Sequence, residues 1–270
     1  NAFQAAPVRV TREHLADSGL LRAVVINSGN ANAWTGGRGL DDARAMAALA
    51  AASVGAEPRQ VAVASTGVIG KGITAATDRL SRDGGGAAAR AIMTTDTFPK
   101  QAVWSHGGFT VGGMAKGAGM IRPDMATMLA FITTDAEADP TGLRQALLYA
   151  VERTFNRITI DGCTSTNDMV LALASGKSGH APSQGELEEA LRDVCSHLAR
   201  AIVEDGEGAT RFVRVRVHGA ADEGEAKRAA MAVAESALVK TALFGGDPNW
   251  RRVVQALGQA VTDADPAGVR

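Results

Sequence analysis

The stretch Lys116-Gly-Ala-Gly-Met-Ile-Arg-Pro-Asp-Met-Ala-Thr-Met-Leu-Ala-Phe-Ile132 joins a glycine-containing loop to an apolar run that starts directly after Thr127. A short, unbroken apolar run of this kind is typical of a buried strand. Similar runs at residues 21–26, 61–64 and 169–174 predict three more buried strands. Residues 211–218 alternate valine with arginine or histidine over most of their length, which predicts a strand with one exposed face.

Helical periodicity separates and follows these runs. It is clearest at residues 41–54, 142–155, 186–203, 223–242 and 250–260. Ser183 with Glu186 three residues later predicts a capping box at the start of the third helix. Segments 81–88 and 175–184 are predicted loops because glycine, serine and proline are frequent there. Strands and helices alternate, so the predicted fold class is α/β, with layered sheets flanked by helices.

The bulk composition excludes several classes of function. A chain of 270 residues with 46% hydrophobic content can bury a full core, and a net charge of -1 lacks the positive field that nucleic-acid binding uses. Neither a run of about 18 apolar residues nor a signal-peptide pattern occurs, so we expect a cytoplasmic protein without a membrane span. The sequence starts at Asn1 rather than at a methionine and stops at Arg270 just after a helical pattern, so we expect both ends to be trimmed.

Metal and nucleotide sites are not predicted. Cys163 and Cys195 form no CxxC pair, and the five histidines show no HExxH spacing, so we expect no metal. Glycine-bearing stretches at 67–72, 112–119 and 245–246 lack the spacing of nucleotide-binding loops. The GxSxG nucleophile motif is also missing, which removes the commonest serine-hydrolase signature but leaves other nucleophiles open, and Thr127 at the start of its apolar run is one of them.

Thr127 needs a base, because a threonine hydroxyl alone is a poor nucleophile. Cutting the Ala126–Thr127 bond would free an α-amine whose pKa is ordinarily about 7.7 to 8.0, and this amine can take the hydroxyl proton. Attack of the hydroxyl on the Ala126 carbonyl, followed by hydrolysis of the ester, would make the cut. On spacing alone, a threonine that simply starts a buried strand is the favoured interpretation, and both alternatives stay open.

The stretch KGAGMIRPDMATML closely resembles the cleavage and nucleophile motif of the ornithine acetyltransferases, also called glutamate N-acetyltransferases. Further segments that resemble this family follow in the same order over most of the chain. They are NSGNANAWTG from Asn27, ASTGVIG from Ala64, AIMTTDTFPK from Ala91, TFNRITIDGCTSTND from Thr154, EGAT from Glu207 and LVKTALFGGDPNW from Leu238. The resemblance implies the layered α/β fold that these enzymes share with the aminopeptidase branch of their superfamily.

The resemblance also implies roles for individual residues. Thr127 would be the nucleophile and acetyl carrier, and Thr66 with Gly67 would form the oxyanion hole. A hydroxyl and a backbone N–H aimed at a developing negative oxygen are what acyl transfer needs. Thr94, Lys116 and Glu207 match substrate-binding positions. A lysine ammonium and hydroxyls can bind a carboxylate, whereas the ornithine side-chain ammonium needs a carboxylate such as Glu207.

The implied reaction is a ping-pong transfer of acetyl from N-acetylornithine to glutamate in arginine biosynthesis. Neither a cofactor nor a metal is required, since the acetyl group is held as an ester on the enzyme between its donor and its acceptor. Some family members also accept acetyl-CoA as the donor. The resemblance implies self-cleavage into residues 1–126 and 127–270, with the two chains remaining associated and pairing again into a heterotetramer. The family extends beyond both ends of this sequence, and its C-terminal tail helps to complete the substrate pocket.

Two positions depart from the family pattern, and two other functions stay open. Arg251 follows DPNW where glycine is usual, and Cys163 stands where aspartate is frequent. One alternative is a self-processed aminopeptidase or amidase of the same superfamily, which releases the acyl group to water and typically uses serine. The other is a non-catalytic, amino-acid-binding homologue that never cleaves itself.

Overall fold

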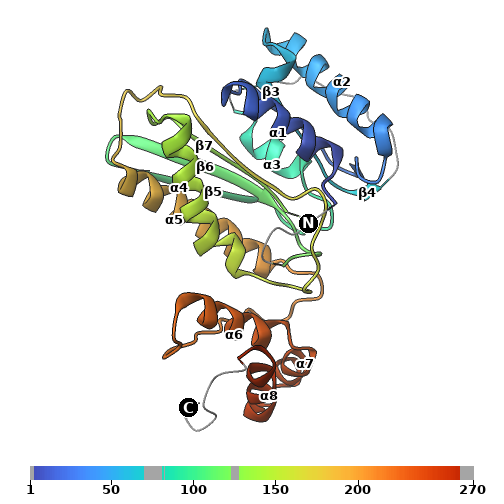
Figure 1. Cartoon of the computed structure of the whole chain (residues 1–270), viewed down its shortest axis with the longest axis vertical. Coiled ribbons are helices and arrows are strands. Elements are labelled where there is room, and N and C mark those ends of the chain that lie inside the picture. The colour runs from blue at the N-terminus through green and yellow to red at the C-terminus, as the bar shows by residue number, and fades with distance from the viewer. Residues whose placement is uncertain (1–2, 70–80, 82, 123–127, 262–270) are drawn as a thin grey trace.

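The computed structural model describes residues 3–69, 81, 83–122 and 128–261. Most of these residues form stacked layers of helices and sheets, and a separate group of helices lies at the C-terminal end (Figure 1). The predicted α/β class is therefore confirmed.

The first layers contain the N-terminal third of the chain. Strands β1 (Ala23–Asn27) and β3 (Val61–Ser65) pair in parallel. Helices α1 (Ala6–Ser18) and α2 (Gly36–Val54) pack on one face of this pair through alanines, Val10, Met46, Val61 and Val63. Small side chains such as alanine allow this close approach of helix and sheet.

A four-stranded sheet forms the next layer. Its strands are β5 (Lys100–His106), β6 (Phe109–Lys116), β7 (Leu129–Thr134) and β8 (Met169–Ala174), in the order β5-β6-β7-β8. The first two pairings are antiparallel, and β7 and β8 pair in parallel. One face of this sheet meets β1 and β3 in a shared core that includes Ala62, Ala64, Leu129, Phe131 and Leu171.

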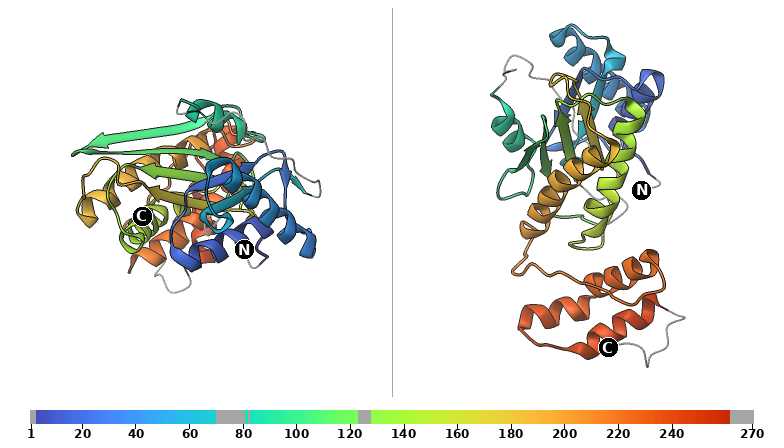
Figure 2. Two further views of the ribbon diagram at one scale, coloured as in Figure 1. Left: turned by 90° about the horizontal axis from the view of Figure 1, so that it is seen from above. Right: turned by 90° about the vertical axis from the view of Figure 1, so that its left-hand side faces the viewer.

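Two long helices cover the other face of the four-stranded sheet (Figure 2). Helix α4 (Pro140–Arg153) follows β7 and precedes β8, which allows these two strands to run in parallel. Helix α5 (Gln184–Glu204) has the predicted Ser183–Glu186 capping box and buries Leu191, Leu198 and Ile202. The strand order and the two sets of helices bury β3 and most of β7, whereas the edge strand β5 keeps one face exposed at Gln101, Val103 and Ser105.

Shorter elements complete these layers. They are β2 (Asn30–Ala31), paired in parallel with β4 (Val68–Ile69), the helix α3 (Gly85–Ala91), and the 3-10 turns η1 (Pro58–Gln60) and η2 (Phe155–Arg157). The predicted loop at 81–88 was wrong in its second half, because α3 begins at Gly85. The predicted loop at 175–184 is confirmed up to the start of α5.

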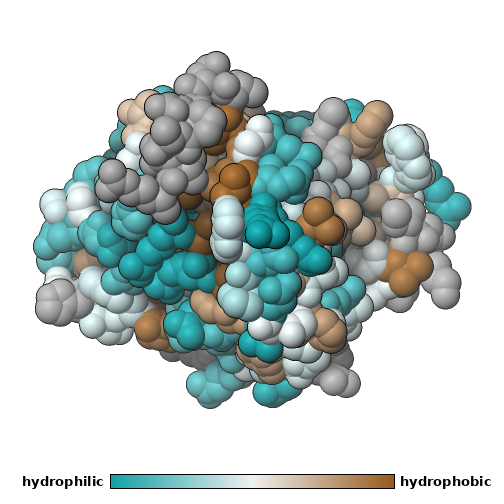
Figure 3. Space-filling view, turned by 90° about the horizontal axis from the view of Figure 1, so that it is seen from below, coloured by the Kyte–Doolittle hydropathy of each residue, from teal (hydrophilic) through white to brown (hydrophobic). Residues whose placement is uncertain are grey.

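The C-terminal helices α6 (Glu223–Glu235), α7 (Ala237–Gly245) and α8 (Trp250–Ala260) have a small core of their own around Val233, Val239 and Ala256. The predicted single helix at 223–242 was wrong, because it breaks at Ser236, whose hydroxyl accepts from the Val239 N–H of α7. Seen from this end, apolar patches lie between hydrophilic side chains (Figure 3).

The strand predicted at residues 211–218 was wrong. This segment is extended, but it pairs with no strand among the residues described, and its residues are exposed or half-buried. Val215 packs on the core of the C-terminal helices instead. The alternating valines therefore belong to an extended connection that packs against helices. Alternation alone does not make a strand, because a strand also needs a neighbouring strand as its hydrogen-bonding partner.

Candidate functional site

The site lies at one edge of the four-stranded sheet, where three strands end or begin. Strand β6 ends at Lys116, which pairs with Leu129 at the start of β7. Leu129 in turn pairs with Met169 at the start of β8. The residues just outside these three strand ends therefore meet at the same edge, although they are far apart in the sequence.

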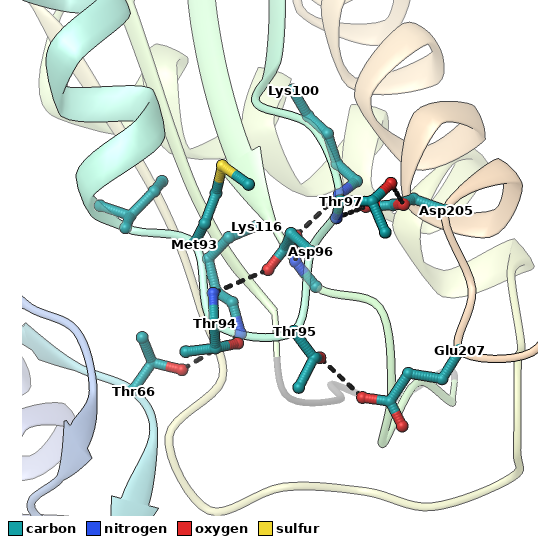
Figure 4. Close-up of polar contacts among 12 residues, drawn as sticks. Thr66, Met93, Thr94, Thr95, Asp96, Thr97, Lys100, Lys116, Asp205 and Glu207 are labelled. Atoms are coloured by element: carbon teal, nitrogen blue, oxygen red, sulfur yellow. Dashed lines mark hydrogen bonds and ion pairs between the residues drawn. The ribbon is translucent and has the colours of Figure 1, made fainter.

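Lys116 and Thr66 connect this edge to the other sheet. The Lys116 side chain is buried, with 2% of the residue exposed, and its Nζ donates to Thr66 Oγ1 at 3.3 Å (Figure 4). Thr66 follows the last residue of β3 and is also buried. Burial lowers the pKa of Lys116, although the nearby Asp96 carboxylate opposes that shift. Composition alone would have placed this lysine on the surface, so its burial is a result of the fold.

Gly67 has a backbone geometry that only glycine adopts readily. Its φ is +118°, and a Cβ at this position would lie 2.3 Å from the carbonyl carbon of Gly29. The next residue, Val68, donates its N–H to Gly29 O at 3.0 Å, whereas the Gly67 N–H has no acceptor among the residues described. Thr66 Oγ and the Gly67 N–H are thus adjacent polar groups at the end of β3.

Thr94 and Glu207 are the other predicted substrate-binding residues that the structure describes. The Thr94 N–H donates to Asp96 Oδ2 at 3.1 Å, and the neighbouring Thr95 Oγ1 donates to Glu207 Oε1 at 2.6 Å. Thr94, Thr95 and Glu207 are exposed, and the Glu207 N–H donates to Ala118 O at 2.7 Å. The segment before β5, the loop after β6 and the segment after α5 therefore meet beside Lys116 (Figure 4).

A buried ion network, which the sequence did not predict, holds these segments together. Lys100 Nζ donates to Asp96 Oδ1 at 2.7 Å and to Asp205 Oδ2 at 2.6 Å, and all three side chains are at most 3% exposed. Asp96 Oδ1 also accepts from the Gly117 N–H at 2.7 Å, and Asp205 accepts from the Thr97 N–H at 2.9 Å. Burial acts to raise the pKa of Asp96, but the hydrogen bonds from Gly117, Lys100 and Thr94 outweigh it and keep this pKa below its usual value.

Asp168 is a second charged residue that the sequence did not predict. It immediately precedes β8, and its Oδ1 accepts from the Met128 N–H at 3.0 Å. Burial raises the pKa of the Asp168 carboxyl to about 7, although hydrogen bonds from the backbone N–H groups of Met128 and Ser165 oppose the shift. It lines a small, mainly apolar cavity together with Ile121, Met128 and Phe155. Its position in a segment that resembles the family motif, TSTND, was the only signal for it in the sequence.

Ala126 and Thr127 lie outside the described residues. The next residue along the chain, Met128, is buried at the edge that also holds Lys116 and Asp168. The roles of Ala126 and Thr127 therefore stay predictions. They agree with the position of the next residue, Met128, at this edge of the sheet.

The remaining features singled out in the sequence take no part in these contacts. Cys163 is exposed, and Cys195 is buried in α5, where burial raises the pKa of its thiol to about 12. The Arg251 guanidinium lies 5.7 Å from the centre of the Trp250 ring. Among the residues described, no cluster of three histidine, cysteine or acidic side chains has a metal-binding arrangement. No helix within 3–69, 83–122 or 128–261 is long and apolar enough to cross a membrane.

The layered sheets and the buried polar groups at their shared edge define an α/β enzyme. The model of the ArgJ family matches residues 1–270, and this chain belongs to that family. The "Arginine biosynthesis bifunctional protein ArgJ" of Symbiobacterium thermophilum is 53% identical, over all of this chain and 71% of the relative. The protein of the same name from Mycolicibacterium paratuberculosis is 49% identical, over 98% of this chain and 70% of the relative. The predicted family is confirmed.

Two solved structures are also similar to this chain. One is the arginine biosynthesis bifunctional protein ArgJ of Bacillus halodurans, 44% identical with a TM-score of 0.42, over 46% of this chain and 71% of that one. The other is the ornithine acetyltransferase of Mycobacterium tuberculosis complexed with ornithine, 42% identical with a TM-score of 0.41, over 46% of this chain and 72% of that one.

Proposed function

We propose that this chain is a glutamate N-acetyltransferase of arginine biosynthesis. It cleaves itself between Ala126 and Thr127 and then transfers acetyl from N-acetylornithine to glutamate through an ester on Thr127. The observation that carries the proposal is the contact of Lys116 Nζ with Thr66 Oγ1 at the sheet edge where Met128 begins to pair. Membership of the ArgJ family supports it.

Thr66 and Gly67 are suited to bind the oxyanion of the tetrahedral intermediate. Thr66 Oγ1 accepts from Lys116, so its own hydrogen is available to donate to a negative oxygen. The Gly67 N–H, which has no acceptor among the described residues, is the second donor. A buried lysine next to the hydroxyl makes it a stronger donor, because charges polarise hydrogen bonds in a medium of low dielectric constant.

Substrate recognition follows from the charges around this pair. The Lys116 ammonium and the Thr94 hydroxyl would bind the substrate carboxylate, and Glu207 would bind the side-chain ammonium of ornithine. Glu207 is exposed and held by Thr95, so its carboxylate is accessible to a cationic ligand. The two cleaved chains, residues 1–126 and 127–270, would stay together, because β6 and β7, on either side of the cut, pair along six residues. A cytoplasmic heterotetramer of these chains is proposed from the family resemblance alone.

The proposal is tested by measuring the intact mass of the protein before and after N-acetylornithine is added. We expect two fragments that separate at Thr127, and an increase of roughly 42 Da on the downstream fragment from the acetyl ester. Glutamate should then remove this mass and yield N-acetylglutamate. A single uncut chain would support the non-catalytic homologue, and acetate without N-acetylglutamate would support the amidase.

Gly119→Ala is expected to raise KM for N-acetylornithine roughly tenfold with little change in stability, because a charge-assisted hydrogen bond is worth about 1.5 to 3 kcal/mol. A Cβ at Gly119 would lie 2.6 Å from the Glu207 carboxylate, which is the flexible end of a side chain and can move away. Steady-state kinetics and thermal melting measure both effects. Gly185→Ala is the control, since no atom lies within 4 Å of its added Cβ. An unchanged KM for N-acetylornithine would contradict the proposed binding of the substrate ammonium by Glu207.

A further inference from the structure

Asp96 is a buried carboxylate that contacts both chain segments proposed to bind the substrate carboxylate. Its side chain is fully buried, and its Oδ2 accepts from the Thr94 N–H at 3.1 Å (Figure 4). Its Oδ1 accepts at 2.7 Å from the N–H of Gly117, the residue that follows Lys116. Thr94 precedes β5, and Lys116 is the last residue of β6. A single carboxylate therefore fixes the backbone of Thr94 relative to the end of β6.

The surroundings of Lys116 disfavour its positive charge. Only 2% of the residue is exposed, and burial lowers the pKa of its ammonium, because a charge is less stable away from water. The nearby Lys100 ammonium lowers this pKa further. The carboxylates that oppose these effects are those of Asp96, Asp168 and Glu207, and Asp96 has the largest influence of the three. Among the residues described, Asp96 is therefore the main support for a charged Lys116.

Asp96 itself stays ionised at neutral pH. Burial acts to raise its pKa, but the hydrogen bonds that it accepts keep this pKa below its usual value. Lys100 does not use up this charge alone, because its Nζ also donates to Asp205 Oδ2 at 2.6 Å. Two buried lysines, Lys100 and Lys116, are thus balanced by two buried aspartates, Asp96 and Asp205. Removing the charge of Asp96 would leave this group with one positive charge too many.

We propose that Asp96 is a positioning residue for substrate recognition: it holds Thr94 beside the end of β6, and its negative charge keeps Lys116 as the ammonium that binds the substrate carboxylate. This inference rests on the proposed function, in which Lys116 and Thr94 bind that carboxylate. Asp96 acts through these two residues and does not itself touch the substrate. Its role in recognition is additional to its part in the buried ion network.

Asp96→Asn tests this role, because it removes the charge and keeps the size of the side chain. Calorimetry measures the Kd of ornithine from about pH 6 to about pH 9. Dividing the Kd of the variant by that of the wild type at each pH cancels the ionisation of ornithine itself. Without Asp96, Lys116 loses its proton at a lower pH than in the wild type. We expect this Kd ratio to rise with pH and to reach about tenfold or more, as a pKa shift of about one unit implies.

Ornithinamide and Asp205→Asn are the matched controls. Ornithinamide has a neutral amide in place of the carboxylate, so its Kd ratio for Asp96→Asn should not rise with pH. Asp205→Asn removes the other negative charge that binds Lys100, but it leaves the charge of Asp96 beside Lys116. Its Kd ratio for ornithine should therefore stay constant with pH. Thermal melting of both variants measures how far each substitution destabilises the fold.

A Kd ratio of Asp96→Asn that is constant with pH would overturn the inference, since a packing defect weakens binding equally at every pH. The same rise with ornithinamide, or with Asp205→Asn, would also overturn it. If Asp96→Asn does not fold, Asp96→Glu decides, because it keeps the charge on a longer side chain. A ratio that does not change with pH is then expected, and a ratio that rises with pH contradicts the inference.

The intact-mass measurement tests the proposed function separately. If the wild-type protein is cut and acetylated but the Kd ratio of Asp96→Asn is constant, the inference fails and the proposed function stands. If the wild type is never cut, the proposed function fails, whatever the Kd ratio shows. A wild type that does not bind ornithine at any pH contradicts both.

Discussion

Alanine at position 127 is expected to leave the chain uncut and to lower acetyl transfer by roughly 10⁴-fold or more, since removing a nucleophile removes the covalent route altogether. The same side chain would attack the Ala126 carbonyl during scission and carry the acetyl group during turnover. Both losses should therefore occur together. Denaturing electrophoresis measures the first loss, and formation of N-acetylglutamate from N-acetylornithine measures the second.

Thr127→Ser is the matched variant, because it keeps a hydroxyl and an α-amine on one residue. We expect it to be cut and to retain turnover, although the missing methyl group changes the rate. Scission and full turnover in the alanine variant would show that another group carries the acetyl. Loss of both activities in the serine variant, with normal folding, would show that the hydroxyl alone is insufficient.

Buried strands were predicted well where their residues are apolar without interruption. Strands β3, β7 and β8 lie within about two residues of the predicted positions, since each is covered on both faces and needs apolar side chains throughout. The hairpin of β5 and β6 was missed because glycines and lysines interrupt it. Gly113 is required there, as a Cβ would lie 2.8 Å from Ile132 Cδ1 and from Val194 Cγ1 of α5. Sequence patterns do not show such close packing.

The site was predicted only where the family motifs named its residues. Lys116 and Thr66 are 50 residues apart, and only the register of β6 with β7 and the packing of the two sheets bring them together. Lys100 and Asp205 are 105 residues apart and would be assigned to the surface from their charges. Their burial depends on tertiary contacts between β5 and the end of α5, for which neither local sequence contains a signal.

Lys100→Met is expected to lower the free energy of unfolding by about 3 to 5 kcal/mol, because it leaves the Asp96 and Asp205 carboxylates buried without their cation. Chemical denaturation at pH 7 measures this loss. Arg59→Met is the control, since the Arg59–Asp17 pair is exposed and such pairs contribute about 0 to 1 kcal/mol. Equal effects of the two substitutions would show that the network does not stabilise the fold.

The pH dependence of the Lys100→Met effect provides an independent check on its cause. In the wild type, the pKa values of Asp96 and Asp205 are below their usual value: hydrogen bonds, including those from Lys100, outweigh the opposing effect of burial. A carboxyl group whose pKa is lower in the folded protein than in the unfolded chain stabilises the fold at pH values above its pKa in the unfolded chain. This stabilisation is lost as the pH falls through its pKa in the folded protein. Without Lys100 the carboxylates take up protons more readily, so the variant recovers as pH falls from 7 towards about 4. The stability difference between wild type and variant should therefore narrow over this range, whereas a simple packing defect would keep it constant.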